Sequence, residues 1–268
     1  MPRASINGIN LYYRVFGHGE PLVLIMGFGG AHEGWFFQTR AFKRHYQVVV
    51  FDNRGLGRSD KSPQPYTIVT MADDAVGLLD HLGIDSAHIL GQSLGGIVAQ
   101  ELAIRYPERV RKLILVSTSC GEGEITDVHP EMLKAIGVED GSTEPNLEAV
   151  DFHESTSTIV SLAFNKKLYR TLLVPLSMYN LKKVGVDGHR AQMQAVVGHT
   201  TTDRLHLIQA PTLVITGTDD RIVSPRSSEA IASRIPDSRL IMVEGGSHAL
   251  NLEMRSRFNS EVLDFLRQ

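Results

Sequence analysis

The chain has 268 residues, of which 42% are hydrophobic and 21% charged, with 24 glycines and a formal net charge of −3. These values are typical of a globular protein with a sizeable core and exclude a fibrous, disordered or disulfide-rich chain. Basic residues occur in runs no longer than pairs such as Lys166-Lys167, so nothing indicates a nucleic-acid surface. We expect a small-molecule partner that is uncharged or modestly charged.

Cysteine usage and hydropathy bear on the compartment. Cys120 is the only cysteine, so disulfides within the chain and Cys/His metal spacings are both excluded. The N-terminal stretch lacks an apolar core of signal-peptide length, and no run approaches the roughly 20 apolar residues that span a bilayer. We expect a cytoplasmic protein with no membrane span, and the oligomeric state stays open.

Up to residue 120, short apolar runs alternate with longer segments of helical periodicity. After an amphipathic opening at 9–15, the runs predict strands over 21–27, 46–52, 87–91 and 110–118. Most of these runs are apolar throughout, as in a parallel sheet covered by helices on both faces. The intervening segments predict helices, such as 71–83, which ends at a glycine suited to a left-handed cap.

From Gly121 the alternation stops for the segment 121–205, which is more polar and has helical stretches near 158–173 and 188–198. It then resumes with strands at 210–217 and 238–246 and helices at 225–235 and 253–268. We therefore predict an α/β fold with a mostly parallel central sheet flanked by helices. Its core comprises 1–120 and 206–268, and a mainly helical cap (lid) at 121–205 interrupts it.

The stretch "GQSLGG" contains the pattern Gly-x-Ser-x-Gly around Ser93. Chance supplies this pattern in roughly one chain in six of this composition, so its context matters more than the match. A nucleophilic serine sits on a sharp strand-to-helix turn, where flanking side chains would collide and glycines avoid this. A strand is predicted before Ser93 and a helix after it. We interpret Ser93 as a nucleophile, in preference to a helix N-cap.

A serine hydroxyl needs a base, and the base needs an acid that orients it. Asp219 and Asp220 follow the strand at 210–217, and His248 follows the strand at 238–246. Open α/β sheets place their sites at the edge where the strands end. We therefore predict that Ser93, one of the two aspartates and His248 meet at one edge of the sheet.

Four stretches, "GQSLGG", "GTDDRIV", "GGSHAL" and "FDNRGLGRSD", resemble motifs of the α/β-hydrolase superfamily. The resemblance covers nearly the whole chain apart from the insertion. It implies that the triad acid is the aspartate directly before Arg221, which is Asp220. It also implies that the backbone N–H groups of Phe28 and Leu94 form the oxyanion hole.

The loop that carries Phe28 departs from the family pattern. Members often have His-Gly where this chain has Met26-Gly27. The change removes a side-chain hydrogen bond that steadies the loop, and Gly29 and Gly30 are expected to leave it more mobile. Loss of an oxyanion donor costs about 10²–10³ in rate, so the order of this loop matters for activity.

Other polar residues receive structural interpretations. Asp52, Arg54 and Ser59 are expected to fix a loop, and Asp73 and Asp74 to complement a helix dipole. His129, His153, His189 and His199 lack i, i+4 metal-ligand spacing, so no metal site is predicted.

Two residues are candidates for the substrate pocket. Trp35 follows the oxyanion loop, although such a residue more often anchors a helix in the core. His199 closes a helix-like stretch and could line the pocket, although a histidine at a helix C-terminus is the commoner case.

The general pattern is similar to carboxylesterases and 3-oxoadipate enol-lactone hydrolases. It implies a serine hydrolase that cleaves small carboxylic esters through an acyl-enzyme, with no cofactor. Ser93 argues against relatives with an aspartate nucleophile. Two alternatives stay open: an enol-lactone or carbon–carbon bond hydrolase with the same triad, and a hydrolase-like ligand receptor that acts through a protein partner.

Overall fold

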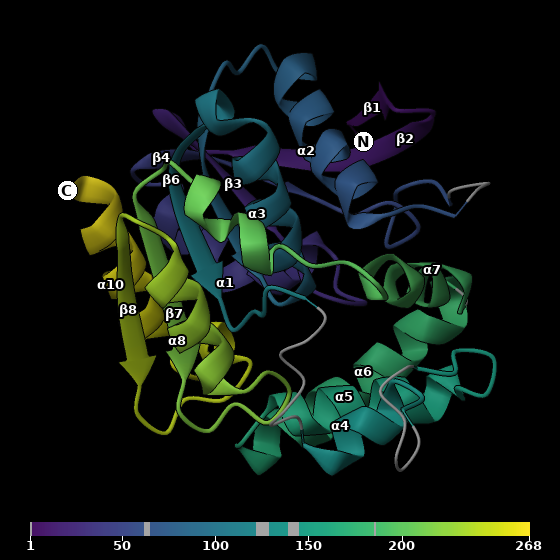
Figure 1. Ribbon diagram of the computed structural model, residues 1–268. Helices are drawn as coiled ribbons and strands as arrows, with labels where there is room; N and C mark the ends of the chain where they lie inside the picture. The colour runs from purple at the N-terminus through teal and green to yellow at the C-terminus, as the bar shows by residue number, and fades with distance from the viewer. Residues whose placement is uncertain (1, 62–64, 122–128, 139–144, 185) are drawn as a thin grey trace.

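The computed structural model describes residues 2–61, 65–121, 129–138, 145–184 and 186–268 (Figure 1). Its centre is an eight-stranded sheet in the order β1-β2-β4-β3-β5-β6-β7-β8. The strands are β1 (Arg3–Ile6), β2 (Ile9–Phe16), β3 (Glu20–Ile25), β4 (Tyr46–Phe51), β5 (Ala87–Gln92), β6 (Val110–Val116), β7 (Thr212–Gly217) and β8 (Ser238–Val243). β2 pairs antiparallel with both β1 and β4, whereas β4, β3, β5, β6, β7 and β8 run parallel to one another. The predicted α/β fold is confirmed.

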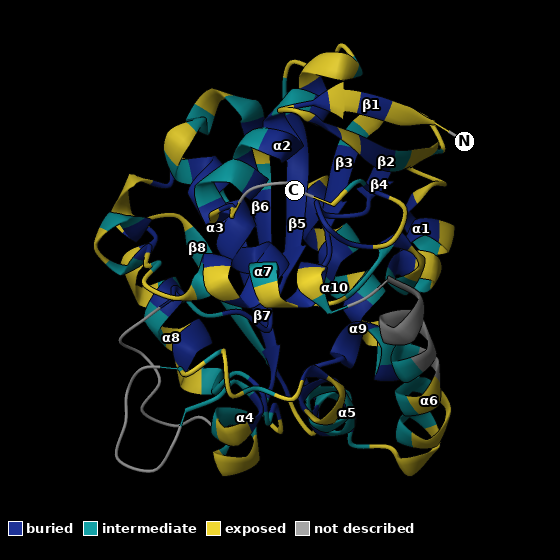
Figure 2. Cartoon of the chain, turned by 90° about the vertical axis from the view of Figure 1, so that its right-hand side faces the viewer, coloured by how far each residue is buried: buried dark blue, intermediate teal, exposed yellow. Residues whose placement is uncertain are grey.

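Helices cover both faces of the sheet, which explains why most strands are apolar throughout (Figure 2). One face packs against α2 (Ile68–His81), α3 (Leu94–Arg105) and α8 (Pro225–Arg234). The other packs against η1 (His32–Trp35), α1 (Phe36–Phe42), α9 (Leu250–Glu253) and α10 (Arg255–Arg267). Short 3₁₀ helices, η2 (Pro107–Arg109) and η4 (Thr202–Leu207), precede β6 and β7.

The cap helices are α4 (Pro130–Ala135), α5 (Phe152–Ala163), α6 (Lys167–Val184) and α7 (Asp187–Val196). They lie beside the carboxyl ends of the strands (Figure 1). The single helical stretch predicted near 158–173 is wrong, because α5 ends at Ala163 and Phe164 is extended, with φ −119° and ψ 134°. Of the predicted cap, residues 122–128, 139–144 and 185 lie outside the described residues, and the division into core and cap stays a prediction.

The chain passes from the sheet to the cap helices and back again at neighbouring positions. A β-bridge joins Gly121 to Thr200, and the backbone N–H of Thr201 donates to the carbonyl of Cys120 at 2.7 Å. The Thr201 hydroxyl also donates to Gln100 Oε1 on α3 at 2.6 Å. Both connections to the cap helices are therefore held against α3.

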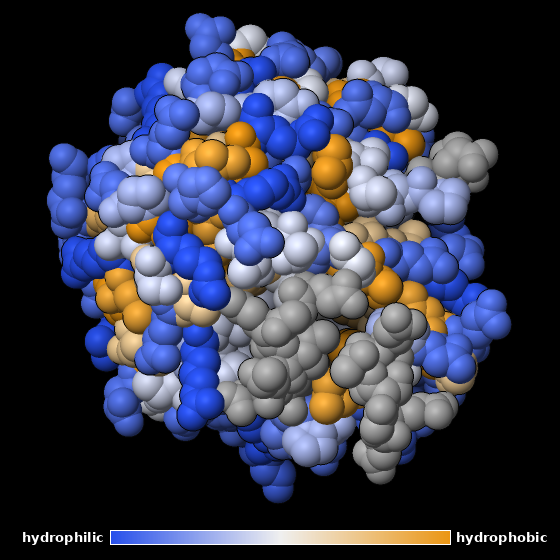
Figure 3. Space-filling model, in the orientation of Figure 1, coloured by the Kyte–Doolittle hydropathy of each residue, from blue (hydrophilic) through white to orange (hydrophobic). Residues whose placement is uncertain are grey.

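The face in Figure 3 is mostly hydrophilic, with apolar side chains in small scattered patches. Large apolar side chains that are exposed include Phe36, Leu168, Leu172 and Val197. Among the described residues, no helix combines the length and the apolar character that crossing a membrane requires.

Candidate active site

The predicted site residues follow four strands of the parallel part of the sheet. Phe28 follows β3, Ser93 follows β5, Asp220 follows β7 and His248 follows β8. The strands β3, β5, β6, β7 and β8 are successive neighbours in the sheet. Because parallel strands end at the same edge, the four loops lie in a row along it.

Ser93 sits on a sharp turn between β5 and α3. Its backbone has φ 54° and ψ −125°, a conformation that costs a non-glycine residue about 1–3 kcal/mol. A Cβ on Gly91 would collide with the Gly95 carbonyl, and one on Gly95 with the Ile25 carbonyl. The Ser93 side chain makes no capping hydrogen bond to α3. The geometry therefore favours the turn of a nucleophile over a helix N-cap.

His248 and Asp220 form a buried pair. His248 Nδ1 lies 2.9 Å from Asp220 Oδ2 and 3.1 Å from Oδ1, so Nδ1 carries the hydrogen and Nε2 is left as the basic nitrogen. Asp220 Oδ1 also accepts hydrogen bonds from the N–H groups of Ile222 (2.9 Å) and Val223 (3.0 Å). Asp219 is exposed, and among the described residues its side chain bonds only to Thr218. The structure thus pairs the histidine with Asp220 rather than Asp219.

The loops that carry this pair pack backbone to backbone. The Asp219 N–H donates to the Gly246 carbonyl at 2.9 Å, and the Gly245 N–H donates to the Thr218 hydroxyl at 2.8 Å. A side chain on Gly217 would collide with the Gly246 backbone. These contacts fix the separation between the acid and the histidine loops.

The loop after β3 lies directly against Ser93. A Cβ on Gly27 would be 3.1 Å from the Ser93 Cβ. The backbone N–H groups of Phe28 and Leu94 donate no hydrogen bond to any residue that the structure describes. Two free N–H groups beside a serine are what an oxyanion hole requires.

Side chains tie this loop at several points. Asn53 Nδ2 donates to the Met26 carbonyl at 3.0 Å, and the Gly29 N–H donates to Gln192 Oε1 at 2.9 Å. These two bonds hold the loop although the histidine of the family pattern is absent. The greater mobility expected of the loop stays a prediction, and these two hydrogen bonds oppose it.

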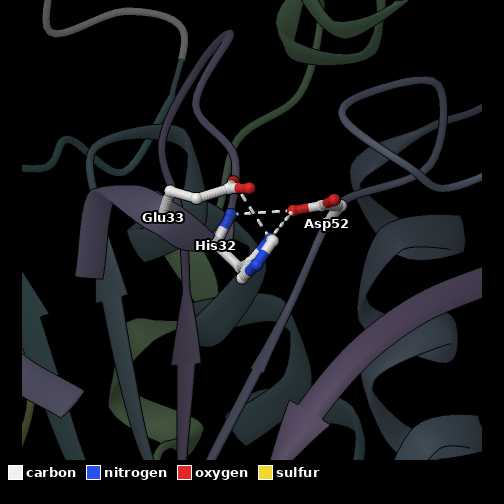
Figure 4. Close-up of side chains that lie close together, drawn as sticks. All are labelled: His32, Glu33 and Asp52. Atoms are coloured by element: carbon white, nitrogen blue, oxygen red, sulfur yellow. Dashed lines mark hydrogen bonds and ion pairs between the residues drawn. The ribbon is translucent and has the colours of Figure 1, made fainter. Parts of the chain in front are cut away.

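His32, Glu33 and Asp52 meet just beyond the same loop (Figure 4). Both the backbone N–H and Nδ1 of His32 lie 2.7 Å from Asp52 Oδ1, and Asp52 Oδ2 accepts from the Arg58 N–H at 2.9 Å. Glu33 approaches His32 Nδ1 at 3.1 Å and the Arg58 guanidinium at 3.4 Å. A cation here would have to displace these donors beside an arginine, so we interpret the cluster as a structural tie.

The segment around Asp52 shows how its other polar residues are used. The Ser59 hydroxyl donates to the Asp52 carbonyl at 2.5 Å and accepts from the Tyr12 N–H at 3.0 Å. Arg54 forms a buried two-point ion pair with Asp74 at 2.6 and 2.5 Å. These contacts agree with the structural interpretation of Asp52, Arg54 and Ser59.

The interpretation of Asp73 and Asp74 as helix-dipole residues is wrong. Helix α2 begins at Ile68, so neither residue lies in its first turn. Asp74 instead pairs with Arg54, and Asp73 accepts a hydrogen bond from the Tyr106 hydroxyl at 2.8 Å. The error arose because the true N-cap, Thr67, precedes the segment expected to be helical.

The two pocket candidates, Trp35 and His199, have different surroundings, and their role in the pocket stays a prediction. Trp35 is fully buried in the core on the α1 and α10 side of the sheet. His199 lies 3.5 Å from Glu101, which is seven residues, roughly 10 Å, along α3 from Leu94. Burial lowers the pKa of His199, and Arg204 acts in the same direction while Glu101 opposes it.

Four polar side chains near these loops were not singled out in the sequence. Gln92 Nε2 donates to the His248 carbonyl at 3.2 Å, and Arg221 donates to the Phe164 carbonyl at 3.0 Å. Glu253 accepts from the Lys166 N–H at 2.7 Å, and Gln192 accepts from Gly29. Gln92 lies within the serine motif and Arg221 within the acid motif, but no local pattern marks Glu253 or Gln192, because their partners are distant in the chain.

Comparisons with known proteins agree with this geometry. The family model for the alpha/beta hydrolase fold matches residues 20–254. The chain is 30% identical to a putative carbamate hydrolase, RutD, of Azorhizobium caulinodans over 99% of this chain and 98% of that protein. It is 29% identical to a poly(3-hydroxyalkanoate) depolymerase of Ectopseudomonas oleovorans, with 94% and 86% covered.

Among solved structures, an enol-lactonase from Burkholderia xenovorans LB400 superposes with a TM-score of 0.86 at 26% identity, covering 100% of both chains. The resemblance to the enol-lactonase-like type is therefore confirmed. The strained serine turn, the order of the strand-end loops and the match over residues 20–254 together show that the chain belongs to the α/β-hydrolase family and is a hydrolase.

Proposed function

We propose that this protein is a serine hydrolase that cleaves small carboxylic esters through an acyl-enzyme. The observation that carries the proposal is the strained turn at Ser93, which lies at the same edge of the sheet as the buried His248–Asp220 pair. Both features have a free-energy cost or a specific geometry that a merely structural role does not require.

Each group has a chemical role in this proposal. Ser93 Oγ attacks the carbonyl carbon while His248 Nε2 takes its proton, and the same nitrogen returns the proton to the leaving group. Asp220 holds the imidazole tautomer and stabilises the imidazolium. The N–H groups of Phe28 and Leu94 receive the oxyanion, which the N-terminus of α3 also stabilises. Water then hydrolyses the acyl-enzyme by the same route.

The comparisons support a substrate with an electrophilic carbonyl. Esters, lactones and carbamates all present such a carbon, and relatives are named for a carbamate, a lactone and a polyester. Enol-lactone hydrolysis is the second candidate, because the enol-lactonase superposes over the full length of both chains. Carbon–carbon bond hydrolysis would use the same triad and belongs in the same substrate panel.

The nucleophile is tested with a short-chain p-nitrophenyl ester and a fluorophosphonate. We expect Ser93→Ala to lose at least about 10³-fold in kcat, and Asp220→Asn about 10⁴-fold, because these groups act as a unit. Ser256→Ala, at an exposed position on α10, is the matched control and should equal the parent. Activity of Ser93→Ala equal to that of the parent, or an adduct mapped to another residue, would contradict the proposal.

The substrate class is tested by comparing kcat/KM over a panel of esters, enol-lactones, carbamates and β-diketones. We expect the highest values for small esters or lactones. A protein that turns over none of them, but binds one and then recruits a protein partner, would instead be a ligand receptor.

A further inference from the structure

We propose that Gln192, on the cap helix α7, positions the oxyanion loop for catalysis. This proposal rests on the proposed hydrolase function, because it concerns the N–H group of Phe28. It gives the cap a direct part in the chemistry, in addition to any part in choosing the substrate.

The key contact is the hydrogen bond from the Gly29 N–H to Gln192 Oε1 at 2.9 Å. Gln192 is fully buried, with 0% of its surface exposed. Because a backbone N–H can only donate, the amide oxygen must face Gly29, and this settles the orientation of the side-chain amide. The bond acts on the peptide unit directly after Phe28.

The other end of the same amide argues against a role in packing alone. Gln192 Nε2 is buried and has no hydrogen-bond partner among the described residues. Leaving a buried donor unpaired costs about 1–3 kcal/mol, and an apolar side chain of similar shape would avoid this cost. The chain thus places a polar side chain where only its oxygen has a partner, and that partner is the oxyanion loop.

The helix that carries Gln192 is well placed to hold the loop. His189, one turn earlier on α7, packs edge-on against the Phe28 ring with centroids 5.6 Å apart. A Cβ on Gly29 would be 3.0 Å from His189 Nε2, and Gly29 has a left-handed φ of +67°. On the other side, Gly188 packs closely against the Gly55 backbone of the core.

The direction of the Phe28 N–H depends on the backbone of residues 27–29. Without the acceptor at Gln192, the Gly29–Gly30 stretch gains freedom and the donor spends less time aimed at the developing oxyanion. The effect should appear in kcat rather than KM, because the oxyanion forms only in the transition state. Its upper bound is the loss of one whole donor, about 10²–10³-fold.

The test compares Gln192→Leu, Gln192→Glu and Gln194→Leu. The leucine variant removes the acceptor, the glutamate variant keeps an acceptor oxygen, and Gln194 is an exposed residue on the same helix. For Gln192→Leu we expect kcat to fall about 10- to 100-fold with KM within about twofold, and a boronic acid inhibitor to bind correspondingly more weakly. Gln192→Glu should recover most of kcat, and Gln194→Leu should match the parent.

Hydrogen exchange provides a readout that does not depend on activity. The amide of Gly29 should exchange faster in Gln192→Leu than in Gln194→Leu, because it loses its acceptor. If Gln192→Leu does not fold, Gln192→Met, which is unbranched at the same position, takes its place.

Unchanged kcat in the folded leucine or methionine variant would overturn the proposal, whatever the exchange result, and so would unchanged exchange at Gly29. A parent protein without Ser93-dependent turnover would instead refute the proposed function. Exchange would then still decide whether Gln192 holds the loop.

Discussion

At the scale of single residues, strain and burial mark where the chain departs from ordinary packing. Ser93 keeps a left-handed backbone although it is not glycine, and His248 and Asp220 form their pair in a buried position. Asp220 tolerates burial because the histidine and two backbone N–H groups share its charge. Each feature would be costly if it were not held by several partners at once.

His199 illustrates a buried residue outside this site. It lies beside Glu101 and Arg204 where the chain re-enters the core, and burial lowers its pKa. A lowered pKa means that the unfolded chain binds a proton more readily than the folded one. The residue therefore lowers the stability of the fold when the pH falls below about 6.5, the ordinary pKa of a histidine. This effect is absent at higher pH.

We predict that His199→Asn loses stability less steeply than the parent between pH 7 and pH 5.5, because the residue that binds its proton only on unfolding is gone. Denaturant unfolding at several pH values measures this. His206→Asn, at an exposed position in η4, is the control. If the free energy of unfolding of His199→Asn changed with pH as steeply as that of the parent, the lowered pKa of His199 would be contradicted. A large loss of kcat/KM would instead indicate that His199 lines the substrate pocket.

At the scale of elements, the position of α3 depends on glycines that let it approach β3 and β6. A Cβ on Gly95 would collide with the carbonyl oxygens of Ile25 and Met26, and one on Gly96 would lie 2.5 Å from the Thr118 side chain. Thr118 in turn donates to the Ser93 carbonyl at 2.7 Å. The helix that carries the Leu94 N–H is therefore located by close backbone contact together with the hydrogen bond from Thr118.

We predict that Gly95→Ala destabilises the protein by about 3 kcal/mol, because α3 must move away from β3. The shift also moves the Leu94 N–H, so kcat should fall together with stability. Gly83→Ala is the control: Gly83 has φ +65° but nothing within 4 Å of the added Cβ, so only about 1 kcal/mol is expected. Equal losses in the two variants, measured by urea unfolding, would be inconsistent with this account.

At the scale of the whole molecule, the cap helices are bonded to three of the four loops of the candidate site, those of Phe28, Asp220 and His248. The turn between α5 and α6 receives hydrogen bonds from the loops of Asp220 and His248: Arg221 donates to the Phe164 carbonyl, and the Ala249 N–H donates to the Ala163 carbonyl at 3.0 Å. At the opposite side, α7 holds the oxyanion loop through Gln192. Movement of these helices would therefore disturb the proposed catalytic groups directly.

Glu253 makes three of the hydrogen bonds that join the cap helices and the histidine loop. Its buried carboxylate accepts from the N–H groups of Asn165 (3.0 Å) and Lys166 (2.7 Å) and from the Ser247 hydroxyl at 2.5 Å. Ser247 directly precedes His248, so one side chain connects the cap to the histidine loop. The two bonds from Asn165 and Lys166 explain why the chain breaks its helix at residues 164–166.

We predict that Glu253→Ala lowers the free energy of unfolding by about 2–3 kcal/mol, because these donors lose their acceptor. Hydrogen exchange should become faster at residues 165–166, and kcat/KM should fall. Glu229→Ala, at an exposed position on α8, should stay within about 0.5 kcal/mol of the parent. Stability of Glu253→Ala within that same range would show that the carboxylate does not fasten the cap.

The sequence predicted the strands β3 to β8 because their apolar runs are bounded by Gly, Asp or Pro, but it did not predict β1, which is short and half exposed. It did not predict the helix break at residues 164–166, because helical periodicity continues through this segment. The acceptor that draws the N–H groups of Asn165 and Lys166 out of a helix is Glu253, almost 90 residues later. It misread Asp73 and Asp74 as first-turn residues because the N-cap, Thr67, lies before the segment expected to be helical.

The sequence by itself determined the α/β class and pointed to Ser93, His248 and one of two adjacent aspartates, because turn chemistry and strand spacing are local and the ends of parallel strands share an edge. Only the tertiary structure decided that His248 pairs with Asp220 and not with Asp219, that Trp35 is fully buried, and that His199 lies beside Glu101. It also brings Gln192 to the loop that carries Phe28. These outcomes depend on side chains that meet across as many as 163 positions in the chain, and no local pattern encodes such distances.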